Sequence, residues 1–261
     1  MTEVIATVEH AAQWADRGRR STARWNPVYR ALMDRAGPPP PHAPEIEGSG
    51  AAGADLVLRQ LSTPALLVVA VTEGERTRCL RIGLDPTGAT LERSDDDHPS
   101  RWTELAVAEV PAAVSALLED SGIDLAPARL EITGDEHALR LTPEQNRLAQ
   151  AALAEGVPAE EAFATLPDLD DPLREALTAT GPRLSLSLTL HDPRRRVTEQ
   201  PVSWSRLWVT GRRGMYRMDR PSTPALEVRP VGGGDVLGTL LPILEQGLRF
   251  AAECTATGGA R

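Results

Sequence analysis

Four consecutive residues in the sequence have side chains that could bind a metal ion. They are three carboxylates followed by an imidazole, namely Asp95, Asp96, Asp97 and His98. Both groups are common ligands of divalent cations, but a linear run cannot surround an ion by itself. A solvated loop is therefore the favoured interpretation of this segment, and a metal site is the alternative.

Two other histidines lie beside a carboxylate. His191 and Asp192 could supply a general base and the group that orients it, but no serine stands in a Gly-x-Ser-x-Gly turn. Asp192-Pro193 is also a common turn former, which explains the pair without catalysis. His137 follows Glu136 in a segment that is equally typical of a polar hairpin tip.

A glycine run, Gly232–Gly234, precedes Asp235 where the last helix is predicted to begin. Backbone N–H groups at such a start can bind phosphate. The P-loop lysine and the Gly-x-Gly-x-x-Gly order are both missing, so a tight turn with Asp235 as helix cap suffices. The cysteines, Cys79 and Cys254, match no zinc pattern. We expect no catalytic residue, metal or cofactor, and a protein that is not an enzyme.

Positive charge concentrates between Arg194 and Arg220, where eight arginines stand against Glu199 and Asp219. Hairpin loops kept soluble by arginine would explain this composition, and a docking surface for an acidic partner is the functional alternative. Tryptophan and methionine interleave with these arginines, as in many interaction hot spots. The candidate partner-binding residues here are Trp204, Arg206, Trp208 and Met215.

Hydrophobic periodicity predicts the elements that position further candidates. Residues 183–190 alternate leucine with small polar residues, which predicts a strand whose polar face carries Ser185, Ser187 and Thr189. Residues 236–250 predict an amphipathic helix whose apolar stripe is wider than one sheet face requires. The stripe is either sandwiched between two layers or partly left for a partner, and its candidate partner-binding residues are Leu240 and Leu244.

Two blocks of the chain look like copies of one β-β-β-β-α unit. Their opening strands start at Ala65 and Leu184, 119 residues apart, and their closing strands start at Leu105 and Leu226, 121 residues apart. A duplication of this kind predicts an α+β protein with two pseudo-twofold-related halves of antiparallel sheet covered by helices.

The other segments complete the predicted domain organisation. One helix is predicted from Val4 to Ala15 and a second from Pro27, capped by Asn26, and the proline and glycine content after them is typical of a linker. The predicted division is an N-terminal helical appendage (1–36), a linker (37–54), a first half (55–141), a helical insert (142–182) and a second half (183–253).

Composition excludes several classes of partner. The 261-residue chain has a formal net charge of −9, which opposes general binding to nucleic acids or anionic membranes. No apolar run reaches the roughly 18 residues of a membrane span, and the amino terminus has no signal-peptide pattern. We therefore expect a cytoplasmic protein that binds no nucleic acid and does not insert into a membrane.

Several segments together carry a likeness to a known family. They are residues 58–74, 151–166, 184–197, 200–218 and 226–246. With the duplicated unit, the chain resembles the EspG family of ESX (type VII) secretion-associated chaperones of actinobacteria, over about residues 55–250. The amino terminus differs, because family members usually begin directly with a strand and a helix.

The resemblance implies a non-enzymatic cytosolic chaperone. It would bind a PE/PPE-like or related helical-hairpin secretion substrate and keep it soluble, using its sheet surface and carboxy-terminal helical region against the apolar tip of the substrate. Two alternatives stay open from the residues themselves. One is a small-molecule or metal-binding enzyme or sensor that uses residues 95–98 with His191, and the other is a structural homodimer held by residues 4–36.

Overall fold

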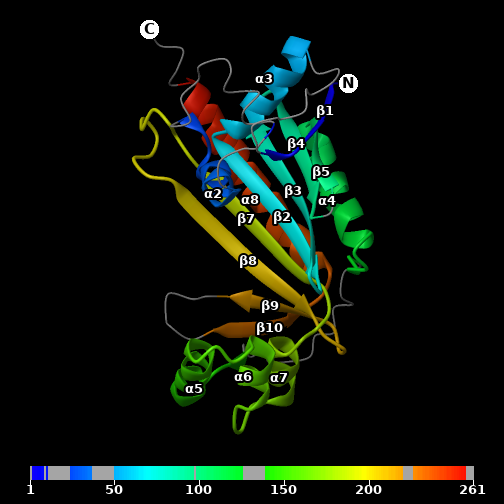
Figure 1. Cartoon of the computed structure of the whole chain (residues 1–261), viewed down its shortest axis with the longest axis vertical. Coiled ribbons are helices and arrows are strands. Elements are labelled where there is room, and N and C mark those ends of the chain that lie inside the picture. The colour runs from blue at the N-terminus through cyan, green and yellow to red at the C-terminus, as the bar shows by residue number, and fades with distance from the viewer. Residues whose placement is uncertain are drawn as a thin grey trace.

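The computed structural model describes residues 2–8, 10, 24–36, 50–96, 98–125, 139–219 and 226–256. Within these ranges ten strands form one antiparallel sheet, in the order β1-β5-β4-β3-β2-β7-β8-β9-β10-β6 (Figure 1). The strands are β1 (Glu3–Ala6), β2 (Ala65–Glu73), β3 (Arg76–Asp85), β4 (Gly88–Asp95), β5 (His98–Leu105), β6 (Leu139–Arg140), β7 (Arg183–Leu190), β8 (Val202–Thr210), β9 (Met215–Asp219) and β10 (Glu227–Val231). The helices are α2 (Pro27–Ala36), α3 (Gly50–Leu61), α4 (Val110–Glu119), α5 (Pro143–Ala154), α6 (Ala159–Ala164), α7 (Asp171–Leu177) and α8 (Gly234–Ala256). The chain is α+β, as predicted.

The strand order is the same on both sides of the central β2–β7 pair. On one side follow β3, β4, β5 and β1, and on the other follow β8, β9, β10 and β6. The fourth consecutive strand of each half leads into a helix, α4 after β5 and α8 after β10. This is the β-β-β-β-α order of the predicted repeat, with one short strand added at each outer edge.

Helices cover the two faces of the sheet differently. On one face, called the α8 face, α8 and α4 pack on apolar side chains of β2, β3 and β7. Gly247 lets α8 approach closely, because a Cβ there would lie 2.5 Å from Leu84 Cδ1. On the other face, called the α3 face, α3 and α2 cover the outer strands of the first half, and α5 and α7 cover β9 and β10 (Figure 1).

Several predicted elements are confirmed. Residues 183–190 form β7, where alternate leucines are buried in the α8 face, and residues 202–210 form β8. Thr142 caps α5 through a capping box of the kind that Thr-Pro-Glu-Gln favours, in which its hydroxyl accepts the Gln145 N–H at 3.2 Å. Gly156 follows that helix with a positive φ of 83°, a conformation that favours glycine at helix ends.

Two predictions in the first half are wrong. The solvated loop expected at Asp95–His98 is shorter than predicted, since β4 ends at Asp95 and β5 begins at His98, because pairing with neighbouring strands overrides the polar composition around it. The closing strand expected to start at Leu105 instead ends there, and α4 begins at Val110.

The amino terminus also differs from its prediction. Residues 3–6 form β1 rather than the start of a helix, since Val4 and Ala6 are buried at period two while Ile5 is 52% exposed. Helix α2 begins at Pro27 as predicted, after Asn26, whose Oδ1 accepts the Val28 N–H at 3.2 Å.

These elements are built into the fold rather than appended to it. Trp25 and Tyr29 share a buried cluster with Val4 and with Trp102 of β5. Helix α3 begins at Gly50, so the end of the predicted linker is helical, and residues 37–49 lie outside the described residues.

Candidate functional site

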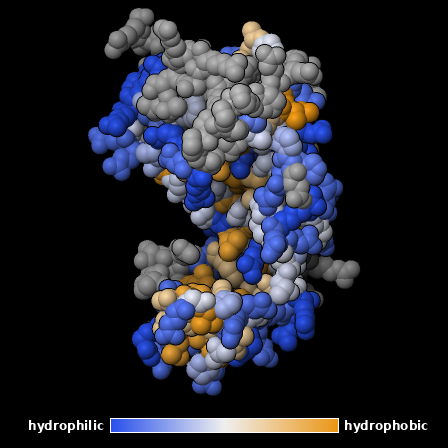
Figure 2. Space-filling model, viewed as in Figure 1, coloured by the Kyte–Doolittle hydropathy of each residue, from blue (hydrophilic) through white to orange (hydrophobic). Residues whose placement is uncertain are grey.

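None of the described helices covers the middle of the α3 face, over β2, β7 and β8. Side chains of these strands that point to this face are exposed or half-buried between the α2/α3 layer and the α5/α7 layer. Figure 2 shows the molecule hollowed between its two ends, as expected where helices cover both ends of a sheet face but not its centre. We call this surface the open strip, and its residues are Val68, Ala70, Ser185, Ser187, Ser203, Ser205 and Leu207.

Small side chains dominate the open strip. Ser185, Ser203 and Ser205 are exposed, and Ser187 is half-buried beside Val68 of the next strand. Because serine and alanine reach only a short way above the backbone, another protein's helices can approach the sheet closely here. The strip offers apolar contact and hydroxyl groups, and its residues carry no charge.

A buried polar network holds one wall of the strip in place. Glu92 of β4 is fully buried, and its carboxylate accepts hydrogen bonds from Tyr29 Oη at 2.6 Å, Arg81 Nη1 at 2.6 Å and Ser100 Oγ at 2.8 Å. Gln60 of α3 donates to Tyr29 Oη at 2.8 Å. Burial, followed by the charge of Glu92, raises the pKa of Tyr29. The hydroxyl therefore stays protonated and donates a hydrogen bond to the carboxylate. The network fixes α2 and α3 to the sheet.

The structure divides the nine predicted partner-binding residues between the two faces. Ser185 and Ser187 belong to the open strip, while Thr189 is buried at its end, with its hydroxyl 3.2 Å from that of Ser203. Trp204 and Arg206 are half-buried on the opposite, α8 face. The four others are buried in the core on the α8 face, namely Trp208, Met215, Leu240 and Leu244.

The arginines near Trp204 have partners within the chain. Arg206 Nε lies 3.1 Å from Asp219, and its guanidinium stands 5.1 Å from the centre of the Trp204 ring. Arg217 Nη1 lies 2.6 Å from Asp235, which also accepts the Trp208 indole N–H at 2.8 Å. The charges of Arg206 and Arg217 are thus balanced within the chain. A role for Trp204 and Arg206 in partner binding remains a prediction.

Two of the residues considered for metal chemistry have structural partners. Asp95 pairs with Arg76 at 2.6 Å, and Asp96 accepts the Thr77 N–H at 2.8 Å. Within the described ranges no three His, Cys, Asp or Glu side chains gather as metal ligands would. Asp97, Glu136 and His137 lie outside the described residues.

Asp192 forms the predicted turn. Its carboxylate accepts the backbone N–H groups of Arg194 at 2.9 Å, Arg196 at 2.5 Å and Val197 at 2.8 Å. Although burial opposes ionisation, these bonds lower the pKa of Asp192. The carboxylate is therefore committed to the turn, whereas the Nε2 atom of His191 is buried without a hydrogen-bond partner among the described residues.

The glycine run and the cysteines also have structural explanations. A Cβ at Gly233 would collide with the backbone of Asp124, so glycine permits this close packing of two chain segments. The carboxylate of Asp235 accepts hydrogen bonds from the Trp208 indole and the Arg217 guanidinium. Burial raises the pKa of both the Cys79 and the Cys254 thiol to about 11, which disfavours the reactive thiolate.

Most residues of the open strip were not among the sequence-derived candidates. Ser203 and Ser205 alternate with Trp204 and Arg206 in β8, and this period-two pattern places them on the opposite face from the tryptophans. The same alternation in β7 identified Ser185 and Ser187. The pattern separates the two faces of a strand, but only the packed structure shows which face the helices leave uncovered.

The fold and the strip together describe an α+β protein with one continuous antiparallel sheet and an uncovered patch between two helical layers. The sequence matches no known family model and no curated protein. Among solved structures, the chain is similar to the Mycobacterium tuberculosis type VII secretion system chaperone EspG5, determined in complex with a PE25–PPE41 dimer. The TM-score is 0.50 at 9% sequence identity, over 97% of this chain and 96% of the other. The likeness extends over the whole fold.

None of the described helices is both long enough and apolar enough to span a bilayer.

Proposed function

We propose that the protein is a chaperone of a type VII secretion pathway that binds a helical PE/PPE-like substrate and keeps it soluble. The observation that carries the proposal is the open strip, an uncovered sheet surface between two helical layers. It is supported by the similarity of the whole fold to a secretion chaperone that was determined with a helical substrate dimer. The proposal places the protein in the cytoplasm, where substrates are made, and gives it a binding role without catalysis.

The strip suits the apolar tip of a helical hairpin. Val68, Ala70 and Leu207 supply apolar contact, and the serines between them can bond to polar groups at the end of a helix. The two helical layers limit how the tip can be oriented, and the Glu92 network keeps one layer rigid before binding. Rigid walls reduce the entropy that is lost on association. A specific complex should bury about 1,200–2,000 Å² in total.

Reconstitution with purified proteins tests this function. The full chain is mixed with each PE/PPE-like pair encoded in the same genome, and complexes are measured by size-exclusion chromatography with light scattering. We expect a stable complex with at least one pair. Absence of a complex with every pair would contradict the proposed function.

Charged substitutions in the strip test the site separately. Ser185→Arg and Ser205→Arg place long cations on exposed positions of the strip and should weaken binding at least about tenfold. Ala252→Arg, at an exposed position of α8, is the matched control and should bind like the wild type. Unchanged binding by both serine variants would mean that the substrate docks elsewhere.

A further inference from the structure

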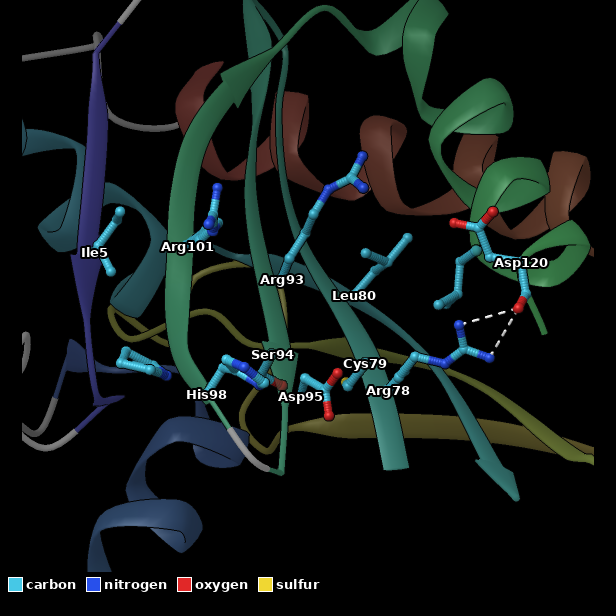
Figure 3. A pocket seen from close by; sticks show the side chains of 12 residues that line it. Ile5, Arg78, Cys79, Leu80, Arg93, Ser94, Asp95, His98, Arg101 and Asp120 are labelled. Carbon is cyan, nitrogen blue, oxygen red and sulfur yellow. Dashed lines mark hydrogen bonds between the residues drawn. The ribbon is translucent and has the colours of Figure 1, made fainter. Parts of the chain in front are cut away.

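A second surface, on the α8 face, has the composition of a ligand site. A pocket of about 420 Å³ lies where the outer strands of the first half meet α4 (Figure 3). This volume is within the range of roughly 300–1,000 Å³ that is typical of small-molecule sites. Apolar side chains from β1, β3 and α4 contribute to its lining, namely Ile5, Leu80 and Leu117.

Arginines project into this pocket without the carboxylate partners that other strand arginines have. Arg93 of β4 makes no hydrogen bond or ion pair with any described residue. Arg101 of β5 has Glu3 at 3.8 Å, the outer limit of an ion pair. By contrast, Arg81 and Arg217 each lie 2.6 Å from a carboxylate oxygen.

The register of the strands brings the two cations together. Arg93 and Arg101 are direct cross-strand partners of β4 and β5, and Figure 3 shows both side chains rising from the same face. Like charges directly opposite each other destabilise a strand pair. An anion bound between the two guanidinium groups would relieve this repulsion and could accept hydrogen bonds from both.

A third arginine forms the opposite wall. Arg78 donates from both Nη atoms to the Asp120 carbonyl at 3.1 Å, which fixes its side chain at the end of α4. The carboxylate of Asp95, also in the lining, is paired with Arg76. The pocket thus combines apolar side chains with two arginines, Arg93 and Arg101, that have no carboxylate oxygen within 3.5 Å among the described residues. Such a local positive charge is notable because the chain as a whole has a formal net charge of −9.

We propose that this pocket binds a small organic acid, with its carboxylate between Arg93 and Arg101 and its apolar chain against Leu80 and Leu117. The charge of the arginines selects the carboxylate, and the apolar side chains of Leu80 and Leu117 select a ligand with several methylene groups. This proposal does not rest on the chaperone function, because the open strip lies on the other face of the sheet.

Calorimetric titration of the full chain with octanoate tests the proposal. Octanoate should bind saturably at one site, and 1-octanol and acetate should each bind at least about tenfold more weakly, because each lacks one half of the recognised chemistry. Equal affinity for 1-octanol would remove the role of the arginines. Equal affinity for acetate would mean an adventitious anion only, and no saturation with octanoate would also overturn the proposal.

Variants locate the site. Arg93→Gln and Arg101→Gln should each weaken octanoate binding about tenfold, since each removes a charge-assisted hydrogen bond. Arg249→Gln, at an exposed arginine of α8 that pairs with Glu245, is the matched control and should leave the affinity unchanged. Wild-type affinity in both pocket variants, with thermal stability intact, would place octanoate elsewhere and overturn the assignment.

Discussion

Glu92 is a fully buried carboxylate that joins three elements through Arg81, Tyr29 and Ser100. Replacing it by glutamine leaves the mostly buried guanidinium of Arg81 without its counter-charge. Breaking a buried ion pair in this way costs about 3–5 kcal/mol. We expect Glu92→Gln to lower the free energy of unfolding by about that amount, measured by urea denaturation.

The matched control is Glu104→Gln. Glu104 pairs with Arg59 of α3 at 2.7 Å, but both side chains are well exposed, so water screens the pair. Its loss should cost no more than about 1 kcal/mol. Similar losses in the two variants would show that burial does not strengthen the Glu92 network.

His191 should make stability depend on pH. Burial lowers the pKa of its imidazole below the ordinary value of 6.5, and the charge of Arg30 lowers it further. The folded state therefore resists protonation, while the unfolded chain takes up a proton as the pH falls through about 6.5. The contribution of neutral His191 is fully present above that pH and is lost as the pH falls toward the lowered pKa.

Urea denaturation at pH 7.5 and at pH 5.5 measures this contribution. The wild type should lose more stability between the two conditions than His191→Gln, whose side chain does not titrate. If the two proteins lose the same amount, the imidazole does not contribute to the pH dependence.

Two glycines of α8 give a paired test at the scale of the element. A Cβ at Gly247 would lie 2.5 Å from Leu84 Cδ1, whereas a Cβ at Gly238 would meet nothing within 4 Å. Gly247→Ala should destabilise the protein by about 1–3 kcal/mol through overpacking. Gly238→Ala should stabilise it by about 0.5–1 kcal/mol, because alanine is the better helix former. Thermal denaturation should show a lower melting temperature for Gly247→Ala and a higher one for Gly238→Ala than for the wild type. A shift in the same direction for both variants would contradict this account.

The sequence predicts elements well where local chemistry decides them. Thr142 with Gln145 defines the start of α5, and the alternating leucines define β7. Sequence-based prediction is wrong where pairing with neighbouring strands determines the structure. Residues 93–101 are mostly polar and read as a loop, but they form parts of β4 and β5, and β4 also pairs with β3. Two buried residues, Val4 and Ala6, are too short a pattern to distinguish a strand from a helix in the sequence. The pairing of residues 3–6 with β5 makes this segment a strand.

The candidate site was predicted only in part, for a related reason. Alternation in β7 identifies Ser185 and Ser187 as one face of a strand. It does not reveal that helices cover the tryptophan face of β8 and leave its serine face open. Leu240 and Leu244 belong to a wide apolar stripe, and the structure shows both of them buried, whereas Leu241 of the same stripe is 54% exposed.

At the scale of the whole molecule, the amino-terminal residues should be required for stability. Trp25 and Tyr29 are buried against Trp102, and β1 covers the edge of β5. Deleting residues 1–36 should lower the free energy of unfolding by at least about 3 kcal/mol, the low end for losing one buried aromatic side chain. It should also expose Trp102, which increased binding of a hydrophobic dye and a red shift of tryptophan fluorescence would report. A truncated chain as stable as the full one would show that the segment is a separable appendage after all.

The central β2–β7 pair also bears on how the chain folds. Strands β2 to β5 are joined by short connections and can pair as successive hairpins, whereas Ala65 of β2 meets Leu190 of β7 across 125 residues of chain. Closing so long a loop costs entropy before any contact repays it, so the seam between the halves should form late. Until then, the seam edges of β2 and β7 are two unpaired strands that can find each other in different molecules. Domain-swapped dimers, in which one chain's first half pairs with another's second half, are therefore the misassembly to which this architecture is most exposed at high concentration.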